Sequence, residues 1–187
     1  MVVAEAIAEV EVLKDSRLIV WSLREGKRLY AAGYFGKPLG VSKPREESFE
    51  APLILDPIEG VYLLDKGLIK VVSGMERREV SLDELVAVSR ETLEGFDEKF
   101  RVYSDLRERG FVVAPGIKYG CDFAVYQHGP GIDHAPYMVK VKGADEELSA
   151  SEIVEAGRLA TTVRKTFILA VVGGGEVKYL GFKWWKP

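Results

Sequence analysis

The sequence predicts an α/β (α+β) fold of two domains, and three observations support this. The chain has 187 residues, of which 47% are hydrophobic, enough for one medium core or two small ones. Strand patterns of period two alternate with helical patterns that begin at capping residues. Gly95 interrupts the chain after a long helical pattern. We therefore expect a small mixed N-terminal domain over residues 1–94 and a second domain over residues 95–187.

The first domain is expected to begin with a small antiparallel meander. Alanine and valine alternate with glutamate over Ala4–Val12, as in a half-exposed strand. A second strand over Leu18–Leu23 is expected to turn at Arg24–Lys27 and to pair with a third strand over Arg28–Tyr30.

The stretch Gly33–Glu50 is expected to be a long surface loop, because three glycines and two prolines fall within it. It also carries the cations Lys37, Lys43 and Arg45. Two interpretations remain open: a solvated insertion, or a loop whose cations contact a phosphate backbone.

Two helices and a strand complete the first domain. A short helix over Asp56–Lys66, closed by Gly67, precedes a strand over Leu68–Val72. Ser81 and Glu84 have the spacing of a capping box, and the apolar residues after them recur at helical intervals. A longer helix therefore runs from there towards the domain boundary.

The second domain alternates helix and strand in the same way. Its expected elements are, in order, a helix over Phe96–Arg109 ended by Gly110, strands over Phe111–Ala114 and Ile117–Tyr126, a loop over Gln127–Ala135, a strand over Tyr137–Val141, a helix capped by Ser149 and Glu152, a buried strand over Thr166–Val172, a turn at Gly173–Gly175, and a strand over Val177–Trp185. Lysines and tryptophans at the end of the last strand form a composition on which an unpaired base can stack.

Charge and cysteine content limit the classes of function. The net charge of −3 gives no global attraction to a polyanion, so any nucleic-acid contact must use a local basic surface. Cys121 is the only cysteine, and the N-terminus has no basic segment followed by an apolar run. We expect a soluble, cytoplasmic protein without an internal disulfide.

Three side chains suited to acid–base chemistry fall at element junctions: Tyr126 at a strand end, His134 in the following loop and Lys165 after the next helix. Each has an ordinary alternative, namely an interfacial tyrosine, a surface histidine and a lysine that complements a helix dipole. His128, in the same loop, is the alternative candidate for the role given to His134. One cysteine and two histidines six residues apart give no metal-ligand spacing, so we expect no metal and no cofactor.

Four separated motifs resemble one known family, the catalytic subunits of the tRNA-splicing endonucleases of archaea and eukaryotes. In order, they are VYSDLRERGF, GIKYGCDFAVY, DHAPY and VRKTFILAVV. The resemblance covers Tyr103 to about Val172, and the short chain is similar to the single-module archaeal form. It implies that the second domain is a restriction-endonuclease-like α/β nuclease domain with a central mixed sheet.

The resemblance also assigns individual residues. Tyr126 falls on the family's catalytic tyrosine, His134 on its histidine and Lys165 on its lysine. Arg158 falls on an arginine that helps to clamp a bulged base, with Trp184 as its partner here. Contacts to the RNA backbone are expected from three further cations, Lys43, Arg45 and Lys183.

The chemistry that the resemblance implies is transesterification within precursor tRNA at bulge-helix-bulge junctions. The ribose 2′-OH attacks the neighbouring phosphate and leaves a 2′,3′-cyclic phosphate and a 5′-OH. Tyr126 would take the 2′-OH proton, His134 would protonate the leaving oxygen, and Lys165 would meet the developing negative charge. Because an unperturbed phenol has a pKa of about 10, a nearby cation must lower it, and Lys165 could do so.

Two other functions compete with this one. A metal-dependent nuclease of the restriction type would use Asp122 with Lys140 and Lys142. Such a site also needs a second carboxylate two residues before its lysine. The residue two before Lys140 is Met138, and the residue two before Lys142 is Lys140, so neither position holds an acid. A non-catalytic structural or RNA-binding subunit should have lost the three side chains, which this chain keeps.

Assembly is expected to involve a second kind of subunit. The family docks an acidic loop between its last two strands into another subunit, whereas here Gly173–Gly175 precede a single acid, Glu176. The chain is also too short to hold two modules. We therefore expect a heterotetramer of two catalytic chains and two non-catalytic sister chains.

Overall fold

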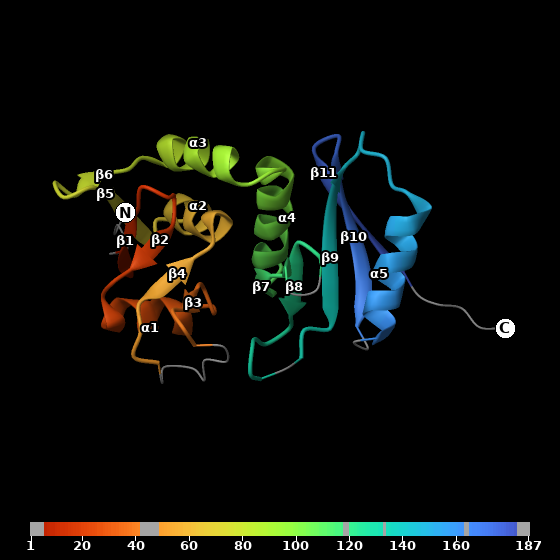
Figure 1. Cartoon of the computed structure of the whole chain (residues 1–187), viewed down its shortest axis with the longest axis horizontal. Helices are drawn as coiled ribbons and strands as arrows, with labels where there is room; N and C mark the ends of the chain where they lie inside the picture. The colour runs from red at the N-terminus through yellow and green to blue at the C-terminus, as the bar shows by residue number, and fades with distance from the viewer. Residues whose placement is uncertain (1–5, 42–48, 118–119, 133, 163–164, 183–187) are drawn as a thin grey trace. The chain divides into compact units, whose positions relative to one another are not determined.

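The computed structural model describes residues 6–41, 49–117, 120–132, 134–162 and 165–182 (Figure 1). The chain divides into two compact units, residues 1–96 and 97–187. Each unit combines one mixed sheet with helices, which confirms the predicted α/β fold class. Within the described residues, no helix has the length and apolar character needed to cross a bilayer.

The first unit is built on a six-stranded mixed sheet in the order β3-β4-β2-β1-β5-β6. Its strands are β1 (Ala8–Val12), β2 (Leu18–Val20), β3 (Lys37–Pro38), β4 (Leu53–Leu55), β5 (Ile69–Ser73) and β6 (Arg78–Glu79). β1 pairs antiparallel with β2 and parallel with β5. The strand predicted from alternating alanine and glutamate therefore lies inside the sheet, where its Ala8 and Val10 are buried.

A helix, α1 (Leu23–Ala31), stands where the meander was expected to continue, so the predicted strand over Arg28–Tyr30 is wrong. Ser22 begins the helix, because its side chain accepts a hydrogen bond from the backbone of the first turn. Gly26, predicted to lie in a turn, is inside the helix, and a Cβ there would come 3.3 Å from Leu53 Cβ. This glycine serves close packing of the helix on the sheet.

The predicted loop over Gly33–Glu50 is not irregular throughout, because β3 interrupts it. β3 pairs with β4 at the edge of the sheet, a position in which its proline is tolerated. Gly36, at φ +77°, leads into the strand, and its amide donates to Glu59 Oε1 at 3.1 Å. Two cations of the predicted loop, Lys43 and Arg45, lie outside the described residues.

Two further helices follow where local signals predict them: α2 (Pro57–Asp65) and α3 (Leu82–Thr92). Asp56 caps the first and Ser81 the second, and each forms a complete capping box with the glutamate three residues later. Gly67, at φ +68°, follows the first helix as predicted.

The second unit is built on a five-stranded mixed sheet in the order β11-β10-β9-β8-β7. Its strands are β7 (Val112–Pro115), β8 (Phe123–Tyr126), β9 (Tyr137–Gly143), β10 (Thr166–Gly173) and β11 (Glu176–Phe182). Neighbouring strands run antiparallel, except that β9 and β10 are parallel and are joined through helix α5 (Ala150–Thr162). This is the central mixed sheet that was predicted.

Helix α4 (Phe96–Glu108) covers one face of this sheet. The ring centroids of its Tyr103 and of Phe123 in β8 lie 5.9 Å apart. The Tyr179 hydroxyl of β11 donates to Asp105 Oδ2 at 2.6 Å, which joins α4 to the last strand. Burial, and then this hydrogen bond, raise the pKa of the Tyr179 phenol, so the hydroxyl stays protonated and remains a donor.

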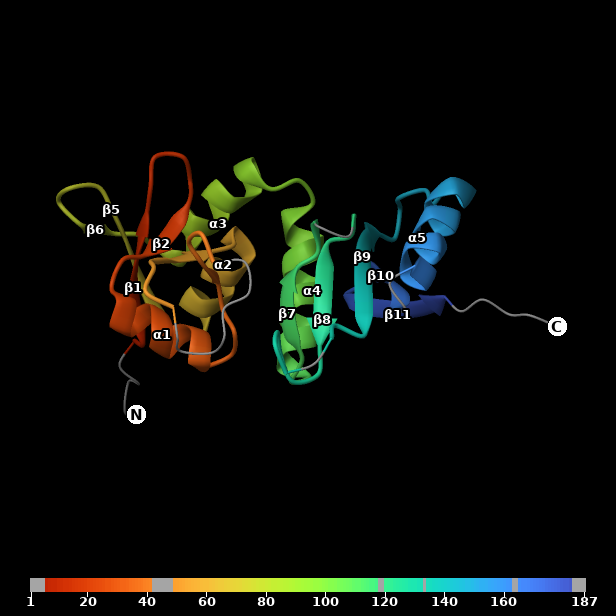
Figure 2. The ribbon, with the colours of Figure 1, turned by 60° about the horizontal axis from the view of Figure 1, so that its bottom comes forward.

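Helix α5 covers the opposite face (Figure 2). Phe167 and Leu169 of β10 form a buried cluster with Leu148, which lies just before the helix. These β10 side chains point away from α4, because Ala170 pairs with Tyr179 on the α4 face and successive residues of a strand face opposite ways. The crossover through α5 brings the chain back to the edge of the sheet at which β9 and β10 begin.

Candidate active site

Tyr126 is the last residue of β8, and its side chain is half-buried. The strand is shorter than predicted, because it begins at Phe123 and includes neither Ile117 nor the described residues 120–122. The Gly116 amide donates to the Asp122 carbonyl at 2.8 Å, just before the strand. Alternation along β8 still places Tyr126 on the face opposite Phe123 and α4.

His134 is exposed and lies in the loop that returns from β8 to β9. The two strands are antiparallel neighbours, since Val125 pairs with Tyr137. The end of β8 and His134 therefore lie at the same edge of the sheet. Ala135, next to His134, is buried, which holds this end of the loop against the sheet. His128 is exposed in the same loop, so exposure alone does not separate the two histidines.

Lys165 immediately precedes β10 and is half-buried. Its Nζ donates a hydrogen bond to the carbonyl of Ala135, thirty residues earlier in the chain. The amide of the next residue, Thr166, donates to the Pro136 carbonyl at 2.9 Å. The ammonium is thereby held beside the loop residue that follows His134.

The three predicted side chains are carried by three neighbouring strands at one edge of the sheet: the end of β8, the approach to β9 and the approach to β10. A phenol, an imidazole and an ammonium carried at neighbouring strand ends can supply a base, an acid and a positive charge. The hydrogen bond from Lys165 to Ala135 also ties the cation to the loop that carries the imidazole.

The predicted RNA-binding residues are described only in part. Arg158 lies on α5 and is exposed. The helix begins with the predicted capping box, in which Ser149 and Glu152 exchange hydrogen bonds of 2.9 and 3.2 Å. Lys183 and Trp184 follow β11 and lie outside the described residues.

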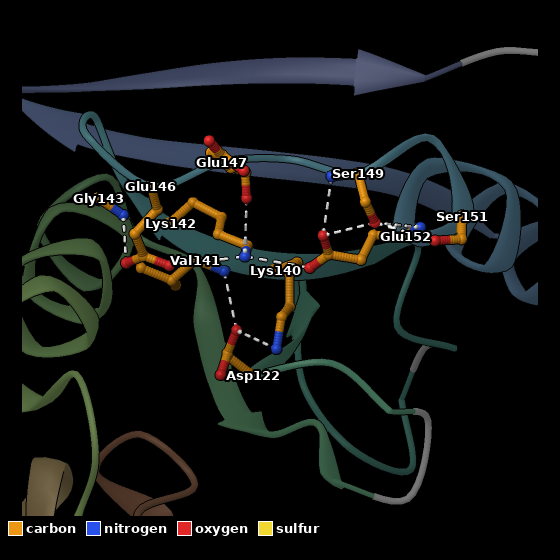
Figure 3. Close-up of polar contacts among 10 residues, drawn as sticks. All are labelled: Asp122, Lys140, Val141, Lys142, Gly143, Glu146, Glu147, Ser149, Ser151 and Glu152. Atoms are coloured by element: carbon orange, nitrogen blue, oxygen red, sulfur yellow. Dashed lines mark hydrogen bonds and ion pairs between the residues drawn. The ribbon is translucent and has the colours of Figure 1, made fainter.

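The carboxylate that suggested a metal-dependent nuclease belongs to an ion-pair cluster (Figure 3). The Asp122 side chain is only 9% exposed, and its oxygens lie 3.2 Å from Lys99 Nζ and 3.6 Å from Lys140 Nζ. It also accepts a hydrogen bond from the Val141 amide at 2.8 Å. In the part of the chain that is described, no three His, Cys, Asp or Glu side chains gather to hold a metal. The charge of Asp122 is thus met by Lys99 and Lys140.

Lys142, two residues further along β9, makes a contact that the sequence pattern does not reveal. Its Nζ lies 3.0 Å from Glu152 Oε1 in the first turn of α5. The sequence shows only the four-residue spacing between Lys142 and Glu146, whose carboxylate is also 3.5 Å away. The contact with Glu152 exists because the chain turns after β9 and brings α5 back over the strand (Figure 3).

Two family models match the chain. Residues 10–86 match the model described as tRNA intron endonuclease, N-terminal domain. Residues 96–179 match the model described as tRNA intron endonuclease, catalytic C-terminal domain. Tyr126, His134 and Lys165 all fall within the second match.

Several curated relatives are similar over nearly their full length. A tRNA-splicing endonuclease of Hyperthermus butylicus is 47% identical over 178 residues, which cover 94% of this chain and 98% of the relative. One of Sulfurisphaera tokodaii is 42% identical over 179 residues, covering 94% and 98%. One of Saccharolobus islandicus is 41% identical over 177 residues, covering 93% and 97%. The similarity therefore extends across both units.

Proposed function

Because the chain belongs to the tRNA intron endonuclease family and is an endoribonuclease of tRNA splicing, we propose that it cuts precursor tRNA at the bulge-helix-bulge junctions between exon and intron. The proposed reaction is a metal-independent transesterification that leaves a 2′,3′-cyclic phosphate and a 5′-OH. The observation that carries this proposal is the position of Tyr126, His134 and Lys165 at one sheet edge, with Lys165 bonded to the Ala135 carbonyl.

Each of the three side chains has a role in this reaction. Tyr126, as the phenolate, takes the proton of the 2′-OH while the bond from O2′ to phosphorus forms. His134, as the imidazolium, gives a proton to O5′ while the bond from phosphorus to O5′ breaks. Lys165 faces the charge that develops on the non-bridging oxygens, and a cation beside a phenol also favours the phenolate.

Substrate recognition is proposed to follow shape more than base identity. Arg158 and Trp184 would sandwich the extruded base, a contact worth roughly 1–3 kcal/mol that any base can make through its π-face. The exposed position of Arg158 on α5 supports this role. Lys43, Arg45 and Lys183 would contact the A-form backbone and add salt-dependent affinity.

Cleavage in EDTA is the test of the proposed function. We expect equal rates in EDTA and in magnesium, because the three side chains supply the base, the acid and the positive charge, and because Asp122 is already held by Lys99 and Lys140. The purified chain, alone and with a candidate sister subunit, is incubated with an intron-bearing precursor tRNA, and the ends of the products are identified.

A matched substrate with a 2′-deoxy nucleotide at the junction is the control, and it should remain uncut because it lacks the attacking oxygen. Loss of cleavage in EDTA with recovery in magnesium would show that the proposed mechanism is wrong.

We also propose a partnership with a non-catalytic sister chain in a heterotetramer of two catalytic and two structural chains. The support lies in the β10–β11 turn, where Gly173–Gly175 are uncharged, Glu176 is the single acid, and Arg101 of α4 donates to the Gly175 carbonyl. A turn with one acid, bonded to its own unit, has little charge for docking into another subunit.

We expect the chain alone to be inactive or poorly active and to form no stable homotetramer. Light scattering that showed a stable, active homotetramer would contradict this.

A further inference from the structure

Lys142 joins β9 to the start of α5. Its side chain is only 16% exposed, and its Nζ lies 3.0 Å from Glu152 Oε1 and 3.5 Å from Glu146 Oε2. The same nitrogen donates to the Glu147 carbonyl at 3.3 Å (Figure 3). The side chains of Glu152 and Glu146 are 41% and 55% exposed, so the junction lies at the surface. Its three partners together nevertheless restrict the ammonium more than a single exposed ion pair would.

Glu152 serves the helix and the sheet at once. Its Oε2 accepts hydrogen bonds from the amide and the hydroxyl of Ser149, both at 2.9 Å, while its own amide donates to Ser149 Oγ at 3.2 Å. Its Oε1 is left for Lys142. The hydrogen bonds from Ser149 and Lys142, with the Ser149 amide first, lower the pKa of Glu152 to about 2. The carboxylate therefore stays charged at neutral pH.

The far half of α5 carries a residue that faces the RNA in the proposed function. Arg158 stands six residues after Glu152, about 9 Å along the helix axis. Successive residues of an α-helix are rotated by about 100°, so the rotation set at Glu152 determines the direction in which Arg158 projects. A loosened first turn would let that direction vary.

We propose that Lys142 is a positioning residue for substrate binding: through Glu152 it fixes α5 on β9 and so holds Arg158 in the orientation that receives a bulged base. This inference rests on the proposed function, since it takes Arg158 as an RNA contact. Lys142 stands near the end of β9, whereas the candidate catalytic side chains gather where β9 begins. It acts on binding through the helix and not on the chemical step.

The first test replaces Lys142 with methionine, which keeps the apolar stem and removes the charge. The KM for a bulged precursor is expected to rise about tenfold with kcat nearly unchanged, which is within the range of coupling found inside one contact network. Lys142→Arg should restore most of the affinity. Glu152→Gln, which keeps an oxygen for the cap but weakens the pair with Lys142, should reproduce the rise in KM.

Lys140→Met is the matched control. Lys140 lies two residues earlier on the same strand and the same face, but it pairs with Asp122, 3.6 Å away, and not with α5. This variant is expected to keep the wild-type KM. If Lys142→Met and Lys140→Met have the same KM while the wild type cleaves, the inference is wrong.

A double-mutant cycle with Arg158→Ala separates positioning from a general loss of stability. If Lys142 acts through Arg158, Lys142→Met should add almost nothing to the rise in KM caused by Arg158→Ala, whereas full additivity would overturn the inference.

Amide hydrogen exchange gives a readout that does not depend on RNA. Exchange in the first turns of α5 should be faster in Lys142→Met than in Lys140→Met, and equal exchange would also overturn the inference. A wild-type chain that does not cut a bulged precursor even when its sister subunit is present would refute the proposed function, and hydrogen exchange would still test the junction.

Discussion

Replacement of His134 by alanine is expected to slow cleavage of a bulged precursor tRNA by about 100-fold or more, the usual effect of losing a general acid. In the variant, water must protonate the 5′-oxygen as its bond to phosphorus breaks. KM should change little, because the lost interaction is made in the transition state. Single-turnover rates at saturating enzyme measure the effect directly.

His128→Ala is the matched control for this prediction. Both histidines are exposed in the same loop, but only His134 adjoins Ala135, whose carbonyl accepts the hydrogen bond from Lys165. Equal losses in the two variants would remove the reason to assign the acid to His134. A precursor with sulfur in place of the 5′-oxygen provides a second check, because a thiolate leaves without protonation. That substrate should restore most of the activity of His134→Ala, and a failure to do so would argue against the assigned role.

Replacement of Lys165 by methionine is expected to slow cleavage by about 100- to 1000-fold, the range found when one group that stabilises transition-state charge is removed. A pH profile of kcat/KM should show a second effect. A cation beside a phenol favours the phenolate, so its loss should move the rise in rate that accompanies ionisation of Tyr126 to higher pH. The difference between the two enzymes should therefore narrow as the pH increases.

Three variants control this prediction. Lys165→Arg keeps the charge and should recover part of the rate, although a guanidinium cannot place one nitrogen as an ammonium does. Lys140→Met removes a lysine from the same sheet and should behave like the wild type. Tyr126→Phe should lose the rise with pH altogether. If Lys165→Met is slower but keeps the wild-type pH profile, the cation does not act on the phenol.

Much of the fold could be predicted because its signals are local. The helices capped at Ser81 and Ser149 appear where a serine precedes a glutamate by three residues, and both capping boxes form. Gly67 and Gly110 end helices at positive φ, a conformation that glycine adopts without steric cost. Such signals involve a few neighbouring residues, so their meaning does not depend on the rest of the chain.

The wrong predictions concern segments whose structure depends on distant packing. Gly26 resembles a hairpin turn in the sequence, but it lies inside α1, which packs so closely on the sheet that a Cβ there would come 3.3 Å from Leu53 Cβ. Ile117 resembles the start of a long strand, but β8 begins only at Phe123, after Asp122 has been fixed by Lys99 of α4 and by the Val141 amide of β9. In both places the same local pattern is compatible with two structures, and contacts with other elements select one of them.

The sequence by itself determined the family, the types of most elements and the identities of the three candidate catalytic side chains. Only the tertiary structure decided which residues lie together. Strand pairing and the crossover through α5 bring Lys165 to the Ala135 carbonyl and Lys142 to Glu152, across thirty and ten residues of chain. No local pattern encodes these contacts, because they arise from burying both faces of one sheet beneath two helices.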